Sequence, residues 1–488
     1  MSQTQPGSSL SYAVRFRVVG RYVGQLGLVL TVVTAVPAIF GLCAGDVAFA
    51  TRIAVCAVGL GLASGLLSRL RAPERIQNNE ALVICASMFL IAPLLMVFPL
   101  MGEGLSFIDA FFEAVSGVTT TGLSALSSVE HRSSSFLFAR SWMQWYGGLG
   151  IVALSLALLT RPGVAAKRLS TAEAEEDDTV GGTRAHSRRV LGIYLGLTLG
   201  AVALLMAFGA PLLDALNHAM AAVSTGGFST YDKSLAGIGG WGLRAAVLLA
   251  SAAGAVSFVF YYRVLGGRWR EPLRSLELRA LVVLCMIVSG LLMLVLWLST
   301  ALPWGQVVGH ALATGFSAQT TTGFSTLDPG RLHPAGKLVT IVSMLIGGNL
   351  GSTAGGMKIV RVLILLSLLR TMVRGTSLSE HAVAAPRLAG GRIEPHRSLD
   401  AMLIVALFVM TVVLSWAGFV AAGYGPLDSL FEVASATGTV GLSAGVLGPD
   451  LEWWLKGVLC FDMLAGRLEM LALLTVFYPG TWFGRRRD

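Results

Sequence analysis

Long hydrophobic runs separated by short polar or charged segments dominate the 488-residue sequence. A helix that crosses a hydrocarbon layer of ~30 Å needs about 20 mostly apolar residues. The sequence contains ten runs of about that size, so we expect ten membrane-spanning helices. They lie near residues 18–43, 51–70, 80–101, 136–160, 190–210, 238–262, 279–301, 338–370, 400–422 and 453–478.

The composition supports a membrane location. Hydrophobic residues make up 54% of the chain and charged residues only 13%, whereas roughly 25% of the residues in soluble domains are charged. Such a chain cannot cover a water-facing surface, and its apolar content excludes disorder. A nucleic-acid-binding role is excluded as well. The five cysteines lie in apolar runs without a CxxC pair, which argues against disulfides and zinc.

The basic residues indicate the orientation. If the N-terminus is cytoplasmic, roughly three quarters of the 36 Lys and Arg residues fall in cytoplasmic segments, as the positive-inside rule requires. Both termini are then cytoplasmic. The first run carries Arg21 and Gln25 and is longer than a signal-peptide core, so we expect a retained span. Residues 161–189 mix acidic and basic side chains and are expected to form a solvated loop.

A short motif occurs four times in the same register. The copies are VTTTGLS (118–124), VSTGGFS (223–229), QTTTGFS (319–325) and TGTVGLS (437–443). The similarity extends upstream, because a polar residue stands nine and thirteen positions before each motif glycine. These residues are Glu113, His218, Thr314 and Glu432, and Asp109, Asp214, His310 and Asp428.

Each motif follows an apolar stretch of about a dozen residues. A helix of that length reaches only ~18 Å, which is too short to span the layer. A half-length helix followed by an extended return is typical of a pore. Potassium loses its water only where a ring of oxygens replaces it, and backbone carbonyls from four copies supply such a ring. Glycine allows the positive φ angles that direct carbonyls to one axis.

The predicted potassium-binding filter takes three residues from each copy. A single Thr/Gly/Ser cluster would be better explained as a loop or a helix contact, but four copies in one register favour a pore. The predicted residues are Thr120, Thr121, Gly122, Thr225, Gly226, Gly227, Thr321, Thr322, Gly323, Thr439, Val440 and Gly441.

Two further features lie inside predicted spans. The run 338–370 is too long for one span, and its glycine-rich middle should not stay helical. We expect a loop at mid-membrane depth there, a close helix–helix contact being the alternative. Arg467 lies within the last span, where a charge must face protein or water. It either lines the pore below the filter or forms an ion pair with Asp462 or Glu469.

These motifs resemble the superfamily of bacterial Trk and Ktr potassium-uptake subunits and plant HKT transporters. The resemblance rests on STGGFST (224–230), TTTGFST (320–326), GSTAGGMKIVR (351–361), GGLGIVAL (147–154) and GRLE (466–469). The two leading spans are more similar to TrkH than to KtrB, although TTTGLSAL and GGNLGSTAGG are Ktr-like. The resemblance implies potassium as substrate, since glycine is present in all four filter copies.

The resemblance also implies a movable gate beneath the filter. The gate residues would be Gly347, Gly348, Asn349, Gly351, Ser352, Thr353, Gly355, Gly356 and Arg467. It further implies a homodimer in the bacterial inner membrane with a cytoplasmic nucleotide-binding subunit of the TrkA/KtrA type. The chain itself has no nucleotide-binding or metal-protease motif and is expected to bind no cofactor.

The predicted fold is therefore an all-α integral membrane protein with four pseudo-symmetric helix–pore-helix–helix units around a central ion pore. The units are 76–165, 166–270, 271–375 (with the gate) and 376–488, preceded by a two-helix segment at 1–75. The expected function is selective potassium uptake. The alternatives are a sodium- or proton-coupled symporter and, less well supported, a membrane enzyme using Asp109, Glu113 or Ser443. The GxSxG match at 441–445 lacks the context of a nucleophile elbow.

Overall fold

The computed structural model describes residues 13–73, 76–159, 179–268, 270, 275–377, 385–389 and 391–483, apart from the side chains of 153–159 and 179–187. Helices dominate this part of the chain. A single two-stranded ribbon pairs β1 (Arg387–Leu388) with β2 (Gly391–Arg392). The protein is therefore an all-α membrane protein, as the hydrophobic pattern predicts.

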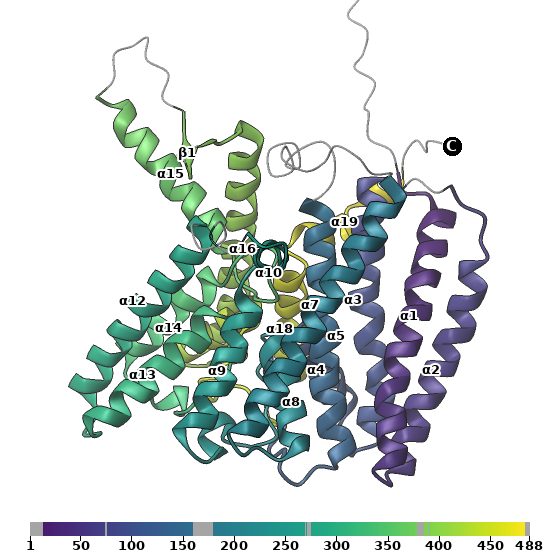
Figure 1. Ribbon diagram of the computed structural model, residues 1–488, viewed down its shortest axis with the longest axis horizontal. Coiled ribbons are helices and arrows are strands. Elements are labelled where there is room, and N and C mark those ends of the chain that lie inside the picture. The colour runs from purple at the N-terminus through teal and green to yellow at the C-terminus, as the bar shows by residue number, and fades with distance from the viewer. Residues whose placement is uncertain are drawn as a thin grey trace, which may run out of the picture.

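A helix or a helix pair stands at each of the ten predicted spans. Six described helices are long and apolar enough to cross a membrane, or seven if one bent pair counts as a span. The two leading helices are α1 (Phe16–Cys43) and α2 (Val47–Ser68). They stand side by side at one edge of the molecule, and α12 and α13 stand at the opposite edge (Figure 1).

The rest of the chain repeats one arrangement four times: a long helix, a short helix, and a second helix that is straight, bent or broken. The first unit contains α3 (Asn78–Met101), α4 (Phe107–Val118) and α5 (Ser134–Leu159). The second contains α7 (Thr179–Ala207), α8 (Leu212–Val223), α9 (Trp241–Ala255) and α10 (Phe258–Leu265). The third contains α12 (Leu276–Ser299), α13 (Trp304–Gln319), α14 (Pro334–Ile346) and α15 (Ile359–Gly375). The fourth contains α16 (Pro395–Ala421), α17 (Pro426–Thr437), α18 (Trp453–Arg467) and α19 (Leu471–Phe477), before the terminal turn α20 (Pro479–Trp482).

The closing helices of three units depart from a straight span. The break between α14 and α15 lies in the glycine-rich stretch, as predicted. The bend of 89° between α9 and α10 and the break between α18 and α19 are differences from the sequence prediction, which had one continuous span at each place. The predicted loop 161–189 also needs correction, because α7 begins at Thr179; residues 161–178 lie outside the described part.

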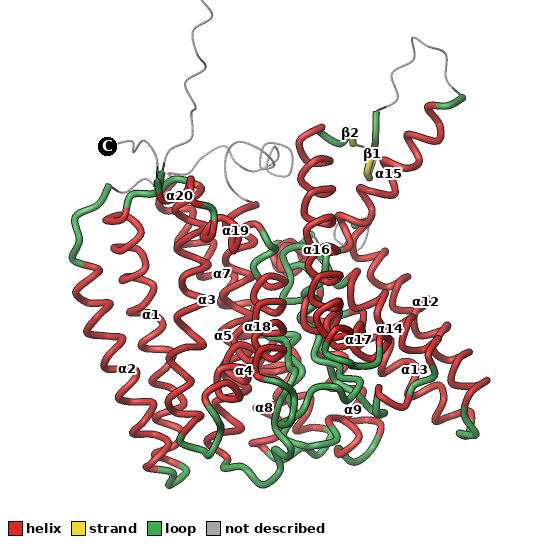
Figure 2. Tube along the Cα trace, turned by 180° about the vertical axis from the view of Figure 1, so that it is seen from behind, coloured by secondary structure: helices red, strands yellow, loops and turns green. Residues whose placement is uncertain are grey.

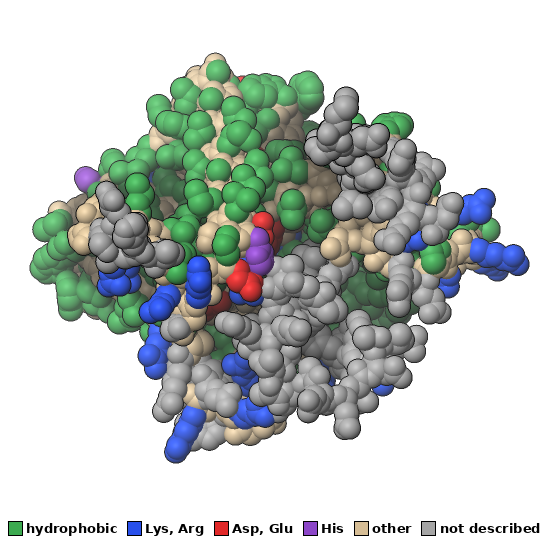
Figure 3. Space-filling view, turned by 90° about the horizontal axis from the view of Figure 1, so that it is seen from above, with side chains coloured by type: hydrophobic (Ala, Val, Ile, Leu, Met, Phe, Trp, Pro, Cys, Tyr) green, Lys and Arg blue, Asp and Glu red, His purple; other side chains and the backbone are tan. Residues whose placement is uncertain are grey.

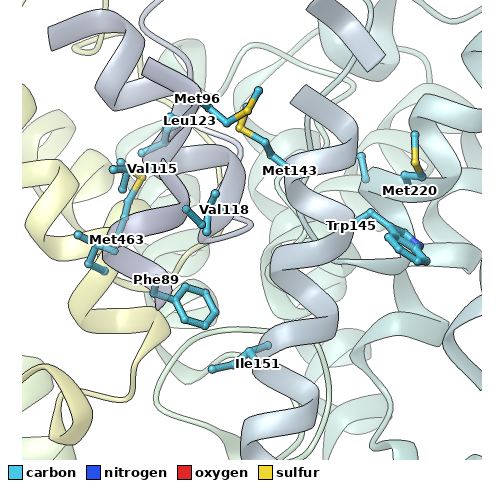
Figure 4. Packing of buried hydrophobic residues seen from close by; sticks show 14 of the residues in the cluster. Phe89, Met96, Val115, Val118, Leu123, Met143, Trp145, Ile151, Met220 and Met463 are labelled. Carbon is cyan, nitrogen blue, oxygen red and sulfur yellow. The ribbon is translucent and has the colours of Figure 1, made fainter. Parts of the chain in front are cut away.

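The carboxyl-terminal halves of the short helices are deeply buried. Val115 and Val118 of α4 point toward Met463 of α18 and Met143 of α5 (Figure 4). The outer helices instead expose apolar side chains where lipid would lie, for example Leu298, which is 75% exposed. The hydrophobic core therefore surrounds the carboxyl-terminal halves of the four short helices.

Candidate functional site

The four motifs lie at the carboxyl ends of the four short helices. In every copy one residue separates the end of the short helix from the three-residue segment that the sequence predicts as the filter, and the chain then continues without regular structure. The residues of these segments are buried or half-buried, and Figure 2 shows loop segments that run between the helices near α17 and α18. Irregular backbone at this depth is tolerated only where protein or a watery cavity surrounds it. We call residues 120–122, 225–227, 321–323 and 439–441 the candidate filter.

The backbone of the candidate filter has the same unusual conformation in all four copies. The first threonine of each copy has a positive φ: 55° at Thr120, 53° at Thr225, 54° at Thr321 and 49° at Thr439. The glycine two residues later also has a positive φ, between 78° and 100°. The strained threonines were not predicted. Left-handed conformations separated by one residue turn the carbonyl groups toward a common side, an arrangement that concentrates oxygen atoms.

The four glycines form a closed ring. A Cβ atom placed on each glycine would lie almost on the carbonyl oxygen of the next copy. The distances are 2.1 Å from Gly122 to Gly226 O, 2.0 Å from Gly227 to Thr322 O, 2.0 Å from Gly323 to Val440 O and 2.3 Å from Gly441 to Thr121 O. The order returns to its starting copy. A side chain at any of the four glycines would therefore displace a carbonyl oxygen of its neighbour.

The surroundings of the ring favour a cation. The four short helices direct their carboxyl ends, which carry partial negative charge, toward the filter segments. Thr120 and Thr439 are buried, and within the described part of the chain their hydroxyl oxygens have no hydrogen-bond partner. Groups of three or more His, Cys, Asp or Glu residues that could hold a metal ion are absent from the described residues. The arrangement offers neutral oxygens, which suit an ion that must leave again.

The polar residues nine positions before the glycines anchor the segment beyond the ring. Glu113 accepts hydrogen bonds from Ser124 Oγ (2.6 Å) and Ala125 N (2.9 Å). Glu432 accepts the equivalent bonds from Ser443 Oγ (2.6 Å) and Ala444 N (2.9 Å). In the second copy His218 Nε2 lies 3.1 Å from Ser229 Oγ. In the first, second and fourth copies the motif serine is thus held by its own short helix, whereas Ser325 N of the third copy donates to Ser234 Oγ (3.2 Å).

The residues thirteen positions before the glycines connect the short helices with their surroundings. Lys456 donates to Asp109 (2.6 Å) and Lys337 to Asp428 (2.5 Å), each pair joining two different units. In the other two copies the partner is the threonine after the motif: Thr230 Oγ1 donates to Asp214 (2.7 Å), and His310 Nδ1 lies 2.9 Å from Thr326 Oγ1.

These contacts bear on the enzyme alternative. Its proposed residues Asp109, Glu113 and Ser443 each have a structural partner, and no two of them meet at one site. Ser443 donates to Glu432, so the serine of the GxSxG match is a tether between the fourth filter copy and its short helix.

The glycine-rich segment 347–356, which we call the candidate gate loop, lies against the inner end of the candidate filter. Gly355 N donates to Thr321 Oγ1 (2.6 Å) and Gly356 N donates to Gly438 O (3.0 Å). A Cβ atom on Gly355 would lie 2.1 Å from Thr439 Oγ1. Thr353 Oγ1 donates to Val223 O (3.0 Å) or Gly254 O (2.9 Å). The loop therefore contacts the second, third and fourth copies.

The other predicted gate residues stabilise the loop from within and from its flanks. Gly347, Gly351 and Gly356 have positive φ angles of 72°, 71° and 72°. Ser352 Oγ donates to Asn349 O (2.7 Å), and Gly348 N donates to Gly355 O (3.3 Å). The helix–helix contact alternative is wrong, because this segment is not helical.

Arg467 lies at the end of α18 and is 2% exposed. Its Nη1 donates to Thr353 O (2.7 Å) and its Nη2 donates to Gly147 O (3.4 Å). The suggested ion-pair partners are engaged elsewhere: Asp462 accepts from Ser415, and Glu469 pairs with Arg361. The structure therefore brings Arg467 to the candidate gate loop.

Several residues at this site were missed in the sequence. Lys358 (φ 73°), Glu469 (φ 54°) and Met470 (φ 61°) have strained backbones at the ends of the two breaks, and the Arg361–Glu469 ion pair joins α15 to the α18–α19 break. The charged residues inside two predicted spans, in the segments MKIVR and GRLE, could have indicated that these positions are functional. Their pairing could not be predicted because 108 residues separate the partners.

The geometry defines a class: a membrane protein in which four repeated units surround one oxygen-lined ring. Comparisons with known proteins agree. The family model for TrkH, described as a cation transport protein, matches residues 49–481. The chain belongs to this family.

Individual relatives span most of the chain. An uncharacterized cation transporter of Methanocaldococcus jannaschii is 30% identical over 84% of this chain and 85% of its own length. The Trk system potassium uptake protein TrkH of Escherichia coli is 27% identical over 96% of this chain and 100% of its own. The crystal structure of the potassium transporter TrkH from Vibrio parahaemolyticus superimposes with a TM-score of 0.85 at 25% identity, covering 96% and 100% of the two chains.

Proposed function

We propose that the protein carries potassium selectively into the cell through the candidate filter. The closed ring of glycines, each facing a carbonyl oxygen of the next copy, carries this proposal. Potassium binds where carbonyl oxygens replace its hydration shell. Relatives that cover almost the whole chain are named as potassium uptake proteins and transporters, which supports potassium rather than another cation.

The candidate gate loop and Arg467 would control this flow. The loop contacts Thr321 directly below the ring, and Arg467 holds the loop at Thr353. A positive charge at this depth opposes a cation leaving the filter toward the cell interior. We infer that the loop and Arg467 together obstruct the path, and that displacement of the loop opens it.

The assembly and orientation belong to the same proposal. Exposed arginines Arg370, Arg374, Arg387 and Arg392 lie at the end of the molecule where α15 and the β1–β2 ribbon project. Figure 3 shows Lys and Arg side chains around this face, and the positive-inside rule then makes it cytoplasmic. We propose an inner-membrane homodimer with both termini in the cytoplasm. A nucleotide-binding partner of the TrkA/KtrA type would act on this face.

The decisive experiment measures ion flux into liposomes that hold the purified protein. Potassium influx should exceed sodium influx and should proceed without a pH gradient and without sodium. Potassium influx that requires sodium or a pH gradient would support the coupled symporter instead. Equal permeation of both ions, or of neither, would contradict the proposed function.

A further inference from the structure

The second copy of the candidate filter lacks a side chain that the other three have. Gly226 stands at the position occupied by Thr121, Thr322 and Val440. Its carbonyl oxygen nevertheless belongs to the ring, because it faces Gly122. Thr121 and Thr322 each share a hydrogen bond of 2.8 Å with the hydroxyl of the threonine two residues earlier, and Val440 is completely buried. A glycine has no side chain to make such a contact.

Gln144 of α5 fills the space behind Gly226. Its side chain is completely buried, and a Cβ atom on Gly226 would lie 2.4 Å from Gln144 Cδ and 2.5 Å from Oε1. Unlike Gly227, Gly226 is not among the residues with positive φ. The glycine is therefore required to make room for Gln144 and not by the backbone conformation.

The amide of Gln144 is bound at both ends to the second copy. Its Nε2 donates to Gly226 O (2.6 Å), and its Oε1 accepts from Phe228 N (3.1 Å). Only this orientation of the amide satisfies both partners, since one is an acceptor and the other a donor. A carbonyl oxygen has two lone pairs, so Gly226 O can accept from Gln144 and still present an oxygen to an ion.

The face of α5 that carries Gln144 also contacts the first copy of the candidate filter through Arg140. Arg140, one turn before Gln144, pairs with Glu113 (3.0 Å), the anchor of the first copy. Its guanidinium also lies 3.8 Å from the ring centroid of Phe228 in the second copy. The face of α5 that carries Arg140 and Gln144 therefore positions two copies of the candidate filter at once.

We infer that Gln144 is a positioning residue for ion selectivity, which supplies from α5 the support that the second filter copy lacks. The inference rests on the proposed function. The direction of the Gly226 carbonyl in the second unit is then set by a side chain of the first unit. Selectivity then depends on an amide that does not itself belong to the repeated motif.

The test compares potassium and sodium flux, normalised to folded protein, for four variants in liposomes. Gln144→Met keeps the volume but removes both hydrogen bonds. We expect the potassium-to-sodium ratio to fall about tenfold, the size of one lost hydrogen bond, because only the bond to Gly226 O acts on a carbonyl of the ring. Gln144→Ala should lower the ratio further. Gly226→Thr alone should be disruptive, because the new side chain collides with Gln144. Gln144→Ala combined with Gly226→Thr restores the pattern of the first and third copies and should recover selectivity relative to either single variant.

The possible results distinguish a failure of the proposed function from a failure of the role assigned to Gln144. Wild-type protein without potassium preference overturns the proposed function. A selective wild type with an unchanged ratio in Gln144→Met overturns this inference alone. If Gln144→Met does not assemble, the double variant decides: a ratio no better than that of Gly226→Thr means that Gln144 serves packing only.

Discussion

Single residues carry the geometry of the ring, and glycine is required there for two reasons. Gly323 has a φ of 81°, and a side chain on it would meet Val440 O at 2.0 Å. A residue with a Cβ atom is strained in this conformation by roughly 1–2 kcal/mol. The contact adds to that strain, because the carbonyl must turn away. The glycine was predicted from the repeat, whereas the reason that all four are needed is visible only in the closed ring.

Gly323→Ser should therefore lower the potassium-to-sodium ratio about tenfold or more, with the protein still inserted. The measurement is flux of each ion per folded molecule. Gly305→Ser is the matched control, since a Cβ at Gly305 meets nothing within 4 Å. An unchanged ratio in Gly323→Ser would remove this glycine from the filter.

Arg467 provides the second residue-scale prediction. At ~4 Å and an effective dielectric near 20, two like charges repel by about 4 kcal/mol, and a wet pore reduces this figure. Arg467→Ala removes the charge and the hydrogen bond to Thr353 O. We expect potassium flux to rise several-fold while the ion ratio stays close to that of the wild type.

Arg467→Lys separates the charge from the hydrogen-bonding geometry. Lysine keeps the charge but lacks the planar fork that reaches Thr353 O and Gly147 O. Its flux should lie between those of the wild type and Arg467→Ala. A fall in flux per folded molecule in Arg467→Ala would show that the arginine is required for structure.

At the scale of elements, the breaks in the closing helices were predictable only where composition changes. The third break contains five glycines between 347 and 356, and helix-breaking composition identified it. The bend after Ala255 occurs in apolar sequence, and the break after Arg467, at residues 468–470, contains the charged Glu469 but neither glycine nor proline. Tertiary contacts produce them: Gly351 O accepts from Phe258 N (2.9 Å) at the first, and Arg361 pairs with Glu469 at the second.

Substitutions at the glycines of the candidate gate loop should affect flux and ion ratio differently, because each glycine contacts a different part of the site. A Cβ on Gly348 would lie 2.4 Å from Ala354 Cβ, inside the loop, whereas on Gly355 it would lie 2.1 Å from Thr439 Oγ1. Overpacking typically costs about 1–3 kcal/mol. Gly348→Ala should loosen the loop and raise flux several-fold without changing the ion ratio. Gly355→Ala should change both flux and ratio. Altered preference with normal flux in Gly348→Ala would contradict the gate assignment.

At the scale of the whole molecule, the ring is closed by contacts between units that are distant in sequence. Lys456 of the fourth unit donates to Asp109 of the first, 347 residues away (2.6 Å). Ser128 Oγ of the first unit donates to Asp232 of the second (2.8 Å). Partial burial opposes the ionisation of Asp232, but its hydrogen bonds from Val129 N and Ser128 outweigh this effect and lower its pKa. The repeat predicts that four units exist, but not which side chains join them.

These contacts predict how the assembled ring responds to the loss of a lysine. Lys456 is 2% exposed and its partner Asp109 is 21% exposed, whereas Lys337 and Asp428 are 9% and 41% exposed. Removing Lys456 leaves a carboxylate that water reaches only in part, at a cost of about 1–3 kcal/mol, below the ~3–5 kcal/mol of a fully buried pair. Lys456→Met should therefore lower the thermal midpoint in detergent more than Lys337→Met does. Adding Asp109→Asn should recover part of the loss, because a neutral amide is less costly to leave unpaired. The ion ratio should stay unchanged in all three proteins, since neither pair touches the ring. Equal midpoints for the two lysine variants would mean that the contact between the first and fourth units does not limit the stability of the ring.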